Sequence, residues 1–229
     1  MPVWGVPPKR RRPLRGTRAA LEGRNPGSTA SYLTTMRTRS AAGPELDAGI
    51  LEGCRRGDSA AQRHVFEQYR DRVYSIAMHF LRGDDAAAHD VAQEVFVKVF
   101  RAVSSYQGTA RFSTWLYRIT ANACMDELRR RRRIVFFGDV PEAVHPATVP
   151  HEDGALDADI TEAVGRLSPK LRMAVLLRYH EDLSYEEIGR ALGCTTGTVA
   201  SRLNRAHAAL ARDLAHLRPR REAADASDA

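Results

Sequence analysis

The residues with the clearest chemical purpose lie near the C-terminal end of the chain, where hydroxyl and guanidinium groups gather on one side of an expected helix. In residues 195–212, Val199 and Leu203 are four positions apart, which is the helical spacing of an inner face. The outer face carries the candidate contact residues Thr196, Thr198, Ser201, Arg202 and Arg205. Arginines and hydroxyls of this kind read base edges or hold phosphates when a helix lies in the major groove. The pattern predicts a helix that reads duplex DNA.

The residues just before this helix predict the other half of a helix-turn-helix. Ser184 followed by Glu187 is a capping box that starts a helix. Gly193 can take the left-handed conformation that ends it, and Thr195 is a typical N-cap for the next helix. Gly189 is small where two helices would cross closely. An ordinary helical hairpin with a solvated face is the alternative, and the agreement among these signals favours the DNA reader.

A second set of polar residues lies on an acidic amphipathic segment, residues 88–102. Its apolar side includes Val91, Val95 and Val99 at helical spacing. Adjoining turns of the other side carry Asp90, Gln93, Glu94 and Val97. Such a helix suits docking to a basic partner helix, and a merely solvated acidic face is an equally open interpretation.

A third set combines basic and aromatic residues around a helix expected at about 113–133. The candidate contacts are Tyr106, Arg111, Phe112, Arg118, Arg129 and Arg130. This mixture suits single-stranded DNA, whose bases stack on rings while arginines hold phosphates. Trp115 falls in the apolar stripe and is expected in the core. A solvated helix end is the alternative explanation of the arginine run at 129–133.

Composition limits the classes of protein to consider. The 229 residues suffice for one or two domains, and 43% of them are hydrophobic. No apolar run is long enough to span a membrane, and the basic N-terminus lacks the apolar stretch of a secretory signal. The three cysteines form no CxxC pair, which argues against a zinc knuckle or a disulfide framework. We expect a cytoplasmic protein without membrane insertion, cofactor or metal site.

Charge and patterning divide the chain into five parts. Residues 1–44 hold nine Lys or Arg and one Glu, against a formal net charge of +7 for the whole chain. They lack apolar periodicity, so we expect a disordered basic extension that binds nucleic acid nonspecifically, unless translation starts at Met36. The rest predicts an all-α fold, because helical periodicity recurs and strand-like alternation does not. The remaining parts are a helical domain, a linker, a helix-turn-helix domain and a disordered tail, at 45–133, 134–157, 158–218 and 219–229.

Start signals place several of the helices. Asp58 should cap a long helix with Phe66 on its inner side, and Asp84 or Asp85 should start the acidic helix. Ser168 followed by proline predicts an N-cap with proline at the first helical position.

Two stretches of the chain resemble parts of one known family. The first stretch resembles region 2 of the extracytoplasmic-function (ECF) group of bacterial sigma factors. It covers residues 84–133, DDAAAHDVAQEVFVKVFRAVSSYQGTARFSTWLYRITANACMDELRRRRR. The second stretch resembles region 4 of that group. It covers residues 167–214, LSPKLRMAVLLRYHEDLSYEEIGRALGCTTGTVASRLNRAHAALARDL. The resemblance implies a four-helix region 2-like domain and a region 4-like helix-turn-helix domain on a flexible linker. It also implies a protein that binds core RNA polymerase and directs promoter-specific initiation.

The resemblance implies roles for residues of the first domain. Asp90, Gln93 and Glu94 match the DxxQE motif with which the family docks on the clamp helices of the polymerase. Residues 106–112 match the loop that opens the −10 element and holds an extruded base of the single strand. Asn122 matches a position that faces the captured strand.

Roles are also implied for the second domain. Ser201, Arg202 and Arg205 match positions that contact the duplex −35 element, although Ala200 stands where many members have Lys or Arg. An anti-sigma factor is a further partner implied by the resemblance alone.

Two functions of other classes compete with this interpretation. A conventional helix-turn-helix regulator would act without joining polymerase, but such proteins usually dimerise, and no dimerisation helix is evident. A nuclease could use His151, Glu152 and Asp153 as metal ligands, but they lie in a Pro- and Gly-flanked linker without a scaffold. Copurification with core polymerase distinguishes a sigma factor from a conventional regulator. A metal-dependent nuclease assay distinguishes it from a nuclease.

Overall fold

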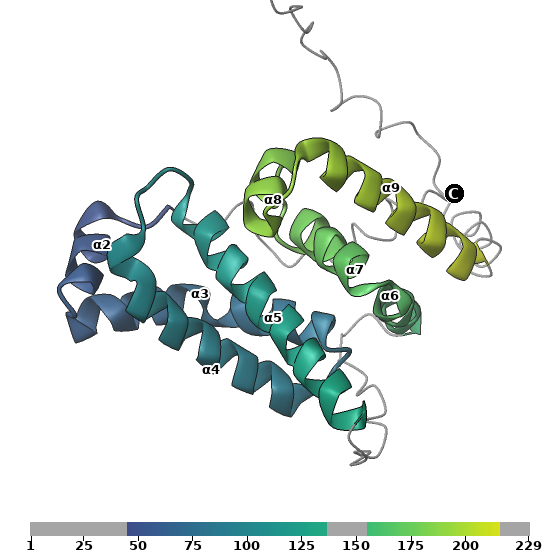
Figure 1. Cartoon of the computed structure of the whole chain (residues 1–229), viewed down its shortest axis with the longest axis horizontal. Helices are drawn as coiled ribbons and strands as arrows, with labels where there is room; N and C mark the ends of the chain where they lie inside the picture. Colours follow the sequence, from purple (N-terminus) through teal and green to yellow (C-terminus); the bar gives the residue numbers. More distant parts are fainter. Residues whose placement is uncertain (1–44, 137–154, 216–229) are drawn as a thin grey trace, which may run out of the picture.

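The computed structural model describes residues 45–136 and 155–215, and every regular element in those stretches is helical (Figure 1). The all-α expectation is therefore confirmed for the described part of the chain. The expected extension 1–44, the tail 219–229 and most of the linker 134–157 lie outside it. Helix α5 continues to Phe136 and α6 begins at Ala155, so both helices reach into the expected linker.

The first group of helices forms a bundle in which α3, α4 and α5 pack against one another. It comprises α2 (Ala48–Arg55), α3 (Ser59–Phe80), α4 (Asp85–Ala102), a 3-10 turn (Val103–Ser105) and α5 (Phe112–Phe136). Aspartate side chains accept backbone N–H groups at the starts of α2, α3 and α4, namely Asp47, Asp58 and Asp84. The caps predicted at Asp58 and Asp84 are confirmed.

The inner face of α3 is narrower than its apolar pattern indicates. Val65 and Tyr69 are fully buried one turn apart, and they occupy the inward positions. Phe66 was predicted on the inner side, but its side chain is 40% exposed, and this prediction is wrong. The reason is geometric, since Phe66 lies about 100° around the helix from Val65. Its ring instead lies edge-on to the Phe96 ring, with centroids 4.9 Å apart.

The second group contains the helix-turn-helix. It comprises α6 (Ala155–Arg166), α7 (Pro169–Val175), a π-helical turn (Leu176–His180), α8 (Tyr185–Leu192) and α9 (Thr196–Asp213). The capping box of Ser184 and Glu187 is confirmed, as is Thr195 as the N-cap of α9. Gly193 ends α8 with φ 61°, the left-handed conformation expected of it. Helix α6 was not foreseen, although Ile160, Ala163 and Val164 give it a short buried stripe.

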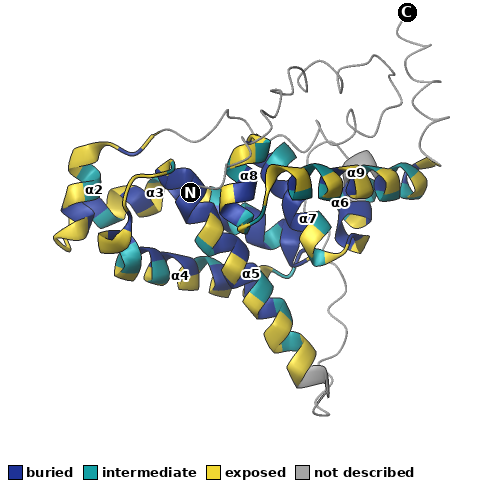
Figure 2. Ribbon diagram, turned by 45° about the horizontal axis from the view of Figure 1, so that its top comes forward, coloured by how far each residue is buried: buried dark blue, intermediate teal, exposed yellow. Residues whose placement is uncertain are grey.

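The two groups of helices pack together. Helix α8 lies against α5, while α6, α7 and the π-helical turn lie against α3. Buried residues continue from α3 and α5 into α7 and α8 as one hydrophobic cluster (Figure 2). The sequence leaves open whether the two domains are apart or together, and the structure has them in contact.

Candidate DNA-binding and docking surfaces

The expected DNA-reading face lies on α9. Thr196, Ser201 and Arg205 are exposed, and Thr198 and Arg202 are half-buried. The inner positions Val199 and Leu203 are fully buried against the rest of the helix-turn-helix, as expected from their spacing.

Local contacts hold this face in place while leaving its charges available. The Thr195 hydroxyl accepts from Thr198 N at 3.2 Å and fixes the first turn of α9. Arg205 Nε donates to the Ser201 carbonyl at 3.2 Å, and Arg202 Nη1 lies 3.6 Å from Cys194 Sγ. Within the described residues no carboxylate forms an ion pair with Arg202 or Arg205. Both guanidinium groups are therefore free to meet phosphates or base edges.

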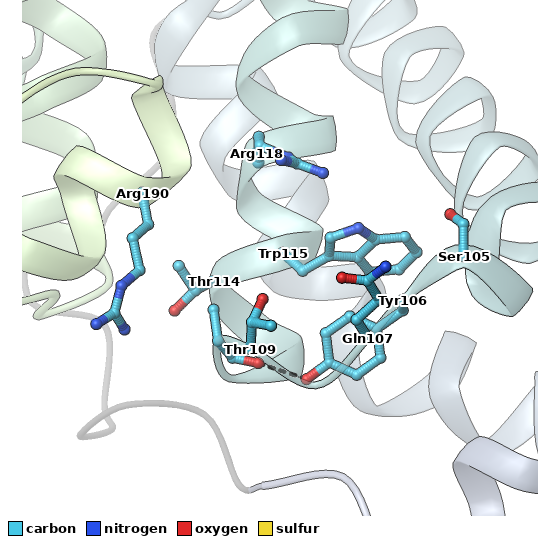
Figure 3. Close-up of a pocket in the computed structure, with 9 residues that line it drawn as sticks. Ser105, Tyr106, Gln107, Thr109, Thr114, Trp115, Arg118 and Arg190 are labelled. Atoms are coloured by element: carbon cyan, nitrogen blue, oxygen red, sulfur yellow. Dashed lines mark hydrogen bonds between the residues drawn. The ribbon is translucent and has the colours of Figure 1, made fainter.

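A second candidate surface is a cavity of about 490 Å³ beside the start of α5 (Figure 3). Tyr106 and Trp115 line one side of it. Phe112 packs against both rings, and the three ring centroids are 5.2–5.6 Å apart. The Tyr106 hydroxyl donates to the Ala110 carbonyl and closes the loop between α4 and α5. The other lining residues are polar or small: Ser105, Gln107, Thr109, Ala110, Thr114, Arg118 and Arg190.

The predicted single-strand contacts divide into two kinds. Phe112 is 3% exposed, and Tyr106 is also buried, so both rings shape the loop from within. Arg118 and Asn122 are exposed one turn apart on α5, and Arg118 reaches the cavity. Trp115 is buried, as expected, but it also lines the cavity. Arg111 is exposed and its Nε donates to Glu45 Oε2 at 3.1 Å.

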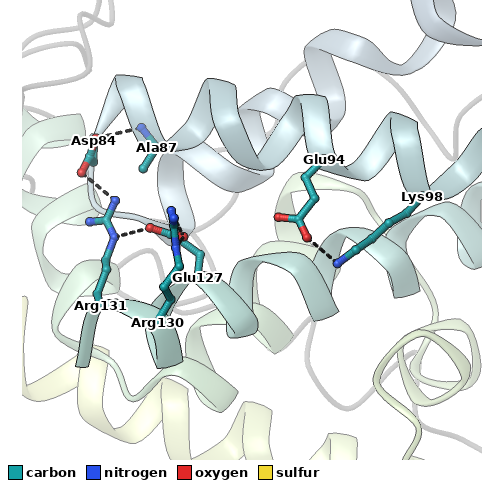
Figure 4. A network of polar contacts seen from close by, with 7 residues as sticks. All are labelled: Asp84, Ala87, Glu94, Lys98, Glu127, Arg130 and Arg131. Carbon is teal, nitrogen blue, oxygen red and sulfur yellow. Dashed lines mark hydrogen bonds and ion pairs between the residues drawn. The ribbon is translucent and has the colours of Figure 1, made fainter. Parts of the chain in front are cut away.

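The arginine run at the end of α5 is partly structural (Figure 4). Arg131 joins two helices, since Nε donates to Glu127 Oε1 at 2.7 Å and Nη2 to Asp84 Oδ2 at 2.8 Å. Arg130 also pairs with Glu127, and Arg129 pairs with Asp126. Burial alone would raise the pKa of Glu127, but hydrogen bonds from Arg131 and Arg130 outweigh it and hold that pKa below its usual value.

The acidic helix α4 presents the expected residues to solvent. Asp90, Gln93 and Glu94 are exposed, and Val97 is 44% exposed opposite the buried valines. Lys98 Nζ pairs with Glu94 at 2.6 Å (Figure 4). Phe66, which was predicted on the inner side of α3, is exposed and contacts Phe96 of α4. The sequence alone does not show that this ring is exposed, because its exposure depends on how the neighbouring helices pack.

Sequence reasoning also missed Thr114 and Arg190 as lining residues. Thr114 is 2% exposed, and its hydroxyl has no hydrogen-bond partner among the residues that the structure describes. Arg190 comes from α8 of the helix-turn-helix, so the second domain forms part of the cavity wall. No local sequence signal links these two residues, which are far apart in the chain.

The described residues contain neither a candidate metal site nor a candidate membrane span. Among them, no cluster of three His, Cys, Asp or Glu side chains could hold a metal ion, and no helix is long and apolar enough to cross a membrane. His151, Glu152 and Asp153 lie outside the described residues. Cys124 is fully buried, and burial raises the pKa of its thiol to about 12, so the thiol stays protonated.

Comparison with known proteins identifies the family to which the chain belongs. The family described as Sigma-70 region 2 matches residues 65–134, and Sigma-70, region 4 matches residues 157–210. The ECF RNA polymerase sigma factor SigE of Mycolicibacterium smegmatis is 44% identical over 160 residues, 65% of this chain and 61% of that protein. The ECF RNA polymerase sigma-E factor of Escherichia coli K12 is 33% identical over 178 residues, 72% of this chain and 92% of that protein.

A solved structure has a similar arrangement of helices. The sigma factor RpoE of Bartonella quintana, in complex with the anti-sigma factor NepR, matches with a TM-score of 0.56 and 26% identity over 66% of this chain and 95% of that chain. The chain therefore belongs to the sigma-70 family of bacterial RNA polymerase sigma factors. Within that family it is a member of the ECF group, and its function is to direct transcription initiation at promoters.

Proposed function

We propose that this sigma factor docks on core RNA polymerase through α4, holds the unpaired −10 strand on α5 and its cavity, and reads the duplex −35 element with α9. The observation that carries the assignment is the presence of three separate exposed polar surfaces on three helices of one sigma-family chain. Each surface has a different chemistry, acidic with apolar, basic with aromatic, and basic with hydroxyl. Polymerase, single-stranded DNA and duplex DNA are the partners that these chemistries suit.

The α4 surface has the composition of a protein interface. Gln93 and Glu94 offer hydrogen-bond acceptors, while Val97 and Phe66, which contacts Phe96 of α4, offer exposed apolar area. An apolar centre with a polar rim is typical of protein interfaces, and large rings often contribute most to binding. We therefore add Phe66 to the proposed docking residues.

Replacing both Gln93 and Glu94 by alanine tests this surface. We expect binding to core polymerase to weaken by about tenfold or more, equivalent to about 1.4 kcal/mol. Helical content should persist, because both side chains are exposed and alanine favours helices. Fluorescence anisotropy with labelled sigma factor measures the affinity. Glu162→Ala, which removes an exposed carboxylate from α6, is the matched control. Normal binding by the double variant contradicts the α4 assignment.

Substitutions in the two proposed DNA-binding surfaces should impair different activities. Arg205→Ala should weaken binding to duplex −35 DNA by about 1–3 kcal/mol if the guanidinium group reads a base. Asn122→Ala should leave duplex binding intact and impair open-complex formation. Gel shifts measure the first effect and permanganate footprinting the second. Equal loss of both activities in both variants would contradict the division of labour.

The partners and setting follow from the same proposal. The similar RpoE structure contains the anti-sigma factor NepR, and we propose an anti-sigma partner for this chain as well. We further propose a cytoplasmic protein that acts by binding and not by catalysis. Copurification with core polymerase distinguishes this function from that of a conventional helix-turn-helix regulator.

A further inference from the structure

The loop between α4 and α5, residues 106–111, is anchored at both ends to residues that precede α3. At its start, Arg55 Nη2 at the end of α2 donates to the Tyr106 carbonyl at 2.7 Å. At its end, Arg111 Nε donates to Glu45 Oε2 at 3.1 Å. The partners are 51 and 66 positions apart in the chain, so both contacts depend on α2 lying beside the loop.

Helix α2 is a fixed support for the loop, because it packs closely on α3. Cys54 is buried, and a Cβ atom at Gly53 would lie only 2.7 Å from the Ala61 Cβ of α3. The Glu52 carboxylate lies 3.4 Å from Arg55 Nη1 and orients the guanidinium group whose other nitrogen bonds to the loop. The position of this donor therefore follows from the packing of the first domain.

The loop benefits from this support because its tip is exposed and contains a glycine. Gly108 has φ 72°, in the left-handed region, and its neighbours Gln107 and Thr109 are exposed. Inside the loop, the Tyr106 hydroxyl donates to the Ala110 carbonyl (Figure 3). Glycine has more backbone freedom to lose than any other residue, so ordering such a tip costs conformational entropy. Anchors at both ends remove part of that freedom before any ligand binds.

We propose that Arg55 and Glu45 are positioning residues for strand capture, which hold the loop in the shape that the unpaired −10 strand requires without touching the strand. This inference rests on the proposed function of the cavity beside α5, which the loop lines. A loop that is ordered in advance pays less entropy when its ligand binds. Both residues precede residue 65, where the match to Sigma-70 region 2 begins, so that match assigns them no role.

The two positioning residues carry opposite charges, which separates positioning from attraction to DNA. If charge alone mattered, Arg55→Ala would weaken strand binding, and Glu45→Gln would strengthen it by releasing Arg111 for phosphates. If both residues position the loop, both substitutions weaken strand binding. We expect about a tenfold loss for Arg55→Ala, which removes a charged hydrogen bond. For Glu45→Gln we expect about a twofold loss, since its ion pair with Arg111 is exposed.

The experiment uses holoenzyme assembled from core polymerase and the full chain. The probe is a fluorescein-labelled single strand with the −10 region of a promoter selected from a randomised library, and anisotropy across a salt series gives its affinity. The affinity should fall in both variants, while the log–log salt slope stays at the parental value. Loss of a direct phosphate contact would instead flatten the slope by about 0.7. Hydrogen exchange of the free chain should become faster in residues 106–111.

Arg56→Ala is the matched control. Arg56 carries the same charge as Arg55 and follows it directly, but its ion pair is with Glu52 at 3.8 Å in the same short segment. Strand affinity and loop exchange should therefore stay at the parental value in this variant. Circular dichroism checks the folding of all three variants, and the exposed position of Glu45 keeps Glu45→Gln informative even if Arg55→Ala folds poorly. Binding to core polymerase and to duplex −35 DNA should not change.

Several results would overturn the inference. They are unchanged strand affinity, a flatter salt slope or unchanged loop exchange in Arg55→Ala, and tighter strand binding by Glu45→Gln. Equal losses in Arg55→Ala and Arg56→Ala, or a loss of core-polymerase or duplex binding in Arg55→Ala, would overturn it as well. If Arg118→Ala and Asn122→Ala both leave strand affinity unchanged, the proposed function of α5 fails instead.

Discussion

At Gly189 the backbone of α8 comes within contact distance of the turn that follows it. A Cβ atom at this position would lie 2.8 Å from the Cys194 carbonyl oxygen, which belongs to the backbone and cannot swing away. Gly189→Ala should therefore destabilise the protein by about 1–3 kcal/mol, the usual result of overpacking. Urea unfolding followed by circular dichroism measures it. Gly197→Ala on α9 is the control, since its Cβ meets nothing closer than 3.9 Å and alanine should stabilise by about 0.5–1 kcal/mol. Equal stability of the two variants would contradict the close approach.

Features that depend on near neighbours in the chain could be predicted from the sequence. Contacts between residues far apart in the chain could not. Ser184, Glu187 and Gly193 could be assigned because each acts within one turn of its own helix. The exposed face of α9 followed from the same periodicity. Tyr117 and Glu181 are 64 positions apart, so their contact depends on how two domains pack. Thr114 and Arg190 escaped prediction for the same reason.

At the scale of elements, α9 is joined to the π-helical turn that follows α7 by a half-buried histidine. His207 Nε2 lies 2.7 Å from the Tyr179 hydroxyl, and burial lowers the pKa of His207 below its ordinary value of about 6.5. The unfolded chain then binds this proton more readily than the folded chain, so stability is complete above about pH 6.5 and falls as the pH drops below it. Urea midpoints at pH 8 and about pH 5.5 measure the loss. His207→Gln, which takes up no proton in this range, should flatten the profile, whereas replacement of the exposed His64 should not.

The starts of helices were predicted more accurately than the burial of their faces. Asp58 and Asp84 start helices where their side chains suggested, because an N-cap needs only its own first turn. Helix α6 was missed because its apolar stripe is short and follows a segment rich in proline and acid. Phe66 was misplaced because a pattern marks apolar residues without giving the width of the buried face.

For the whole molecule, the positive charge is concentrated in one part of the chain. Nine Lys or Arg and one Glu in residues 1–44 give that segment a strong positive charge. Residues 45–229 carry 26 basic and 27 acidic residues and are nearly neutral. Long-range attraction to DNA should therefore come mainly from residues 1–44, and sequence choice from the folded domains.

Deleting residues 1–35 separates these two contributions. Nonspecific affinity for duplex DNA should fall, and its dependence on salt should flatten by about 0.9 in the log–log slope for each phosphate that is no longer neutralised. Promoter preference should persist, because attraction to phosphates carries no information about base sequence. Fluorescence anisotropy across a salt series measures the slope, and transcription from a randomised promoter library with core polymerase measures the preference. A full-length chain and a truncated chain with the same slope would assign the attraction to the folded domains. A changed promoter preference would mean that residues 1–35 take part in reading the DNA.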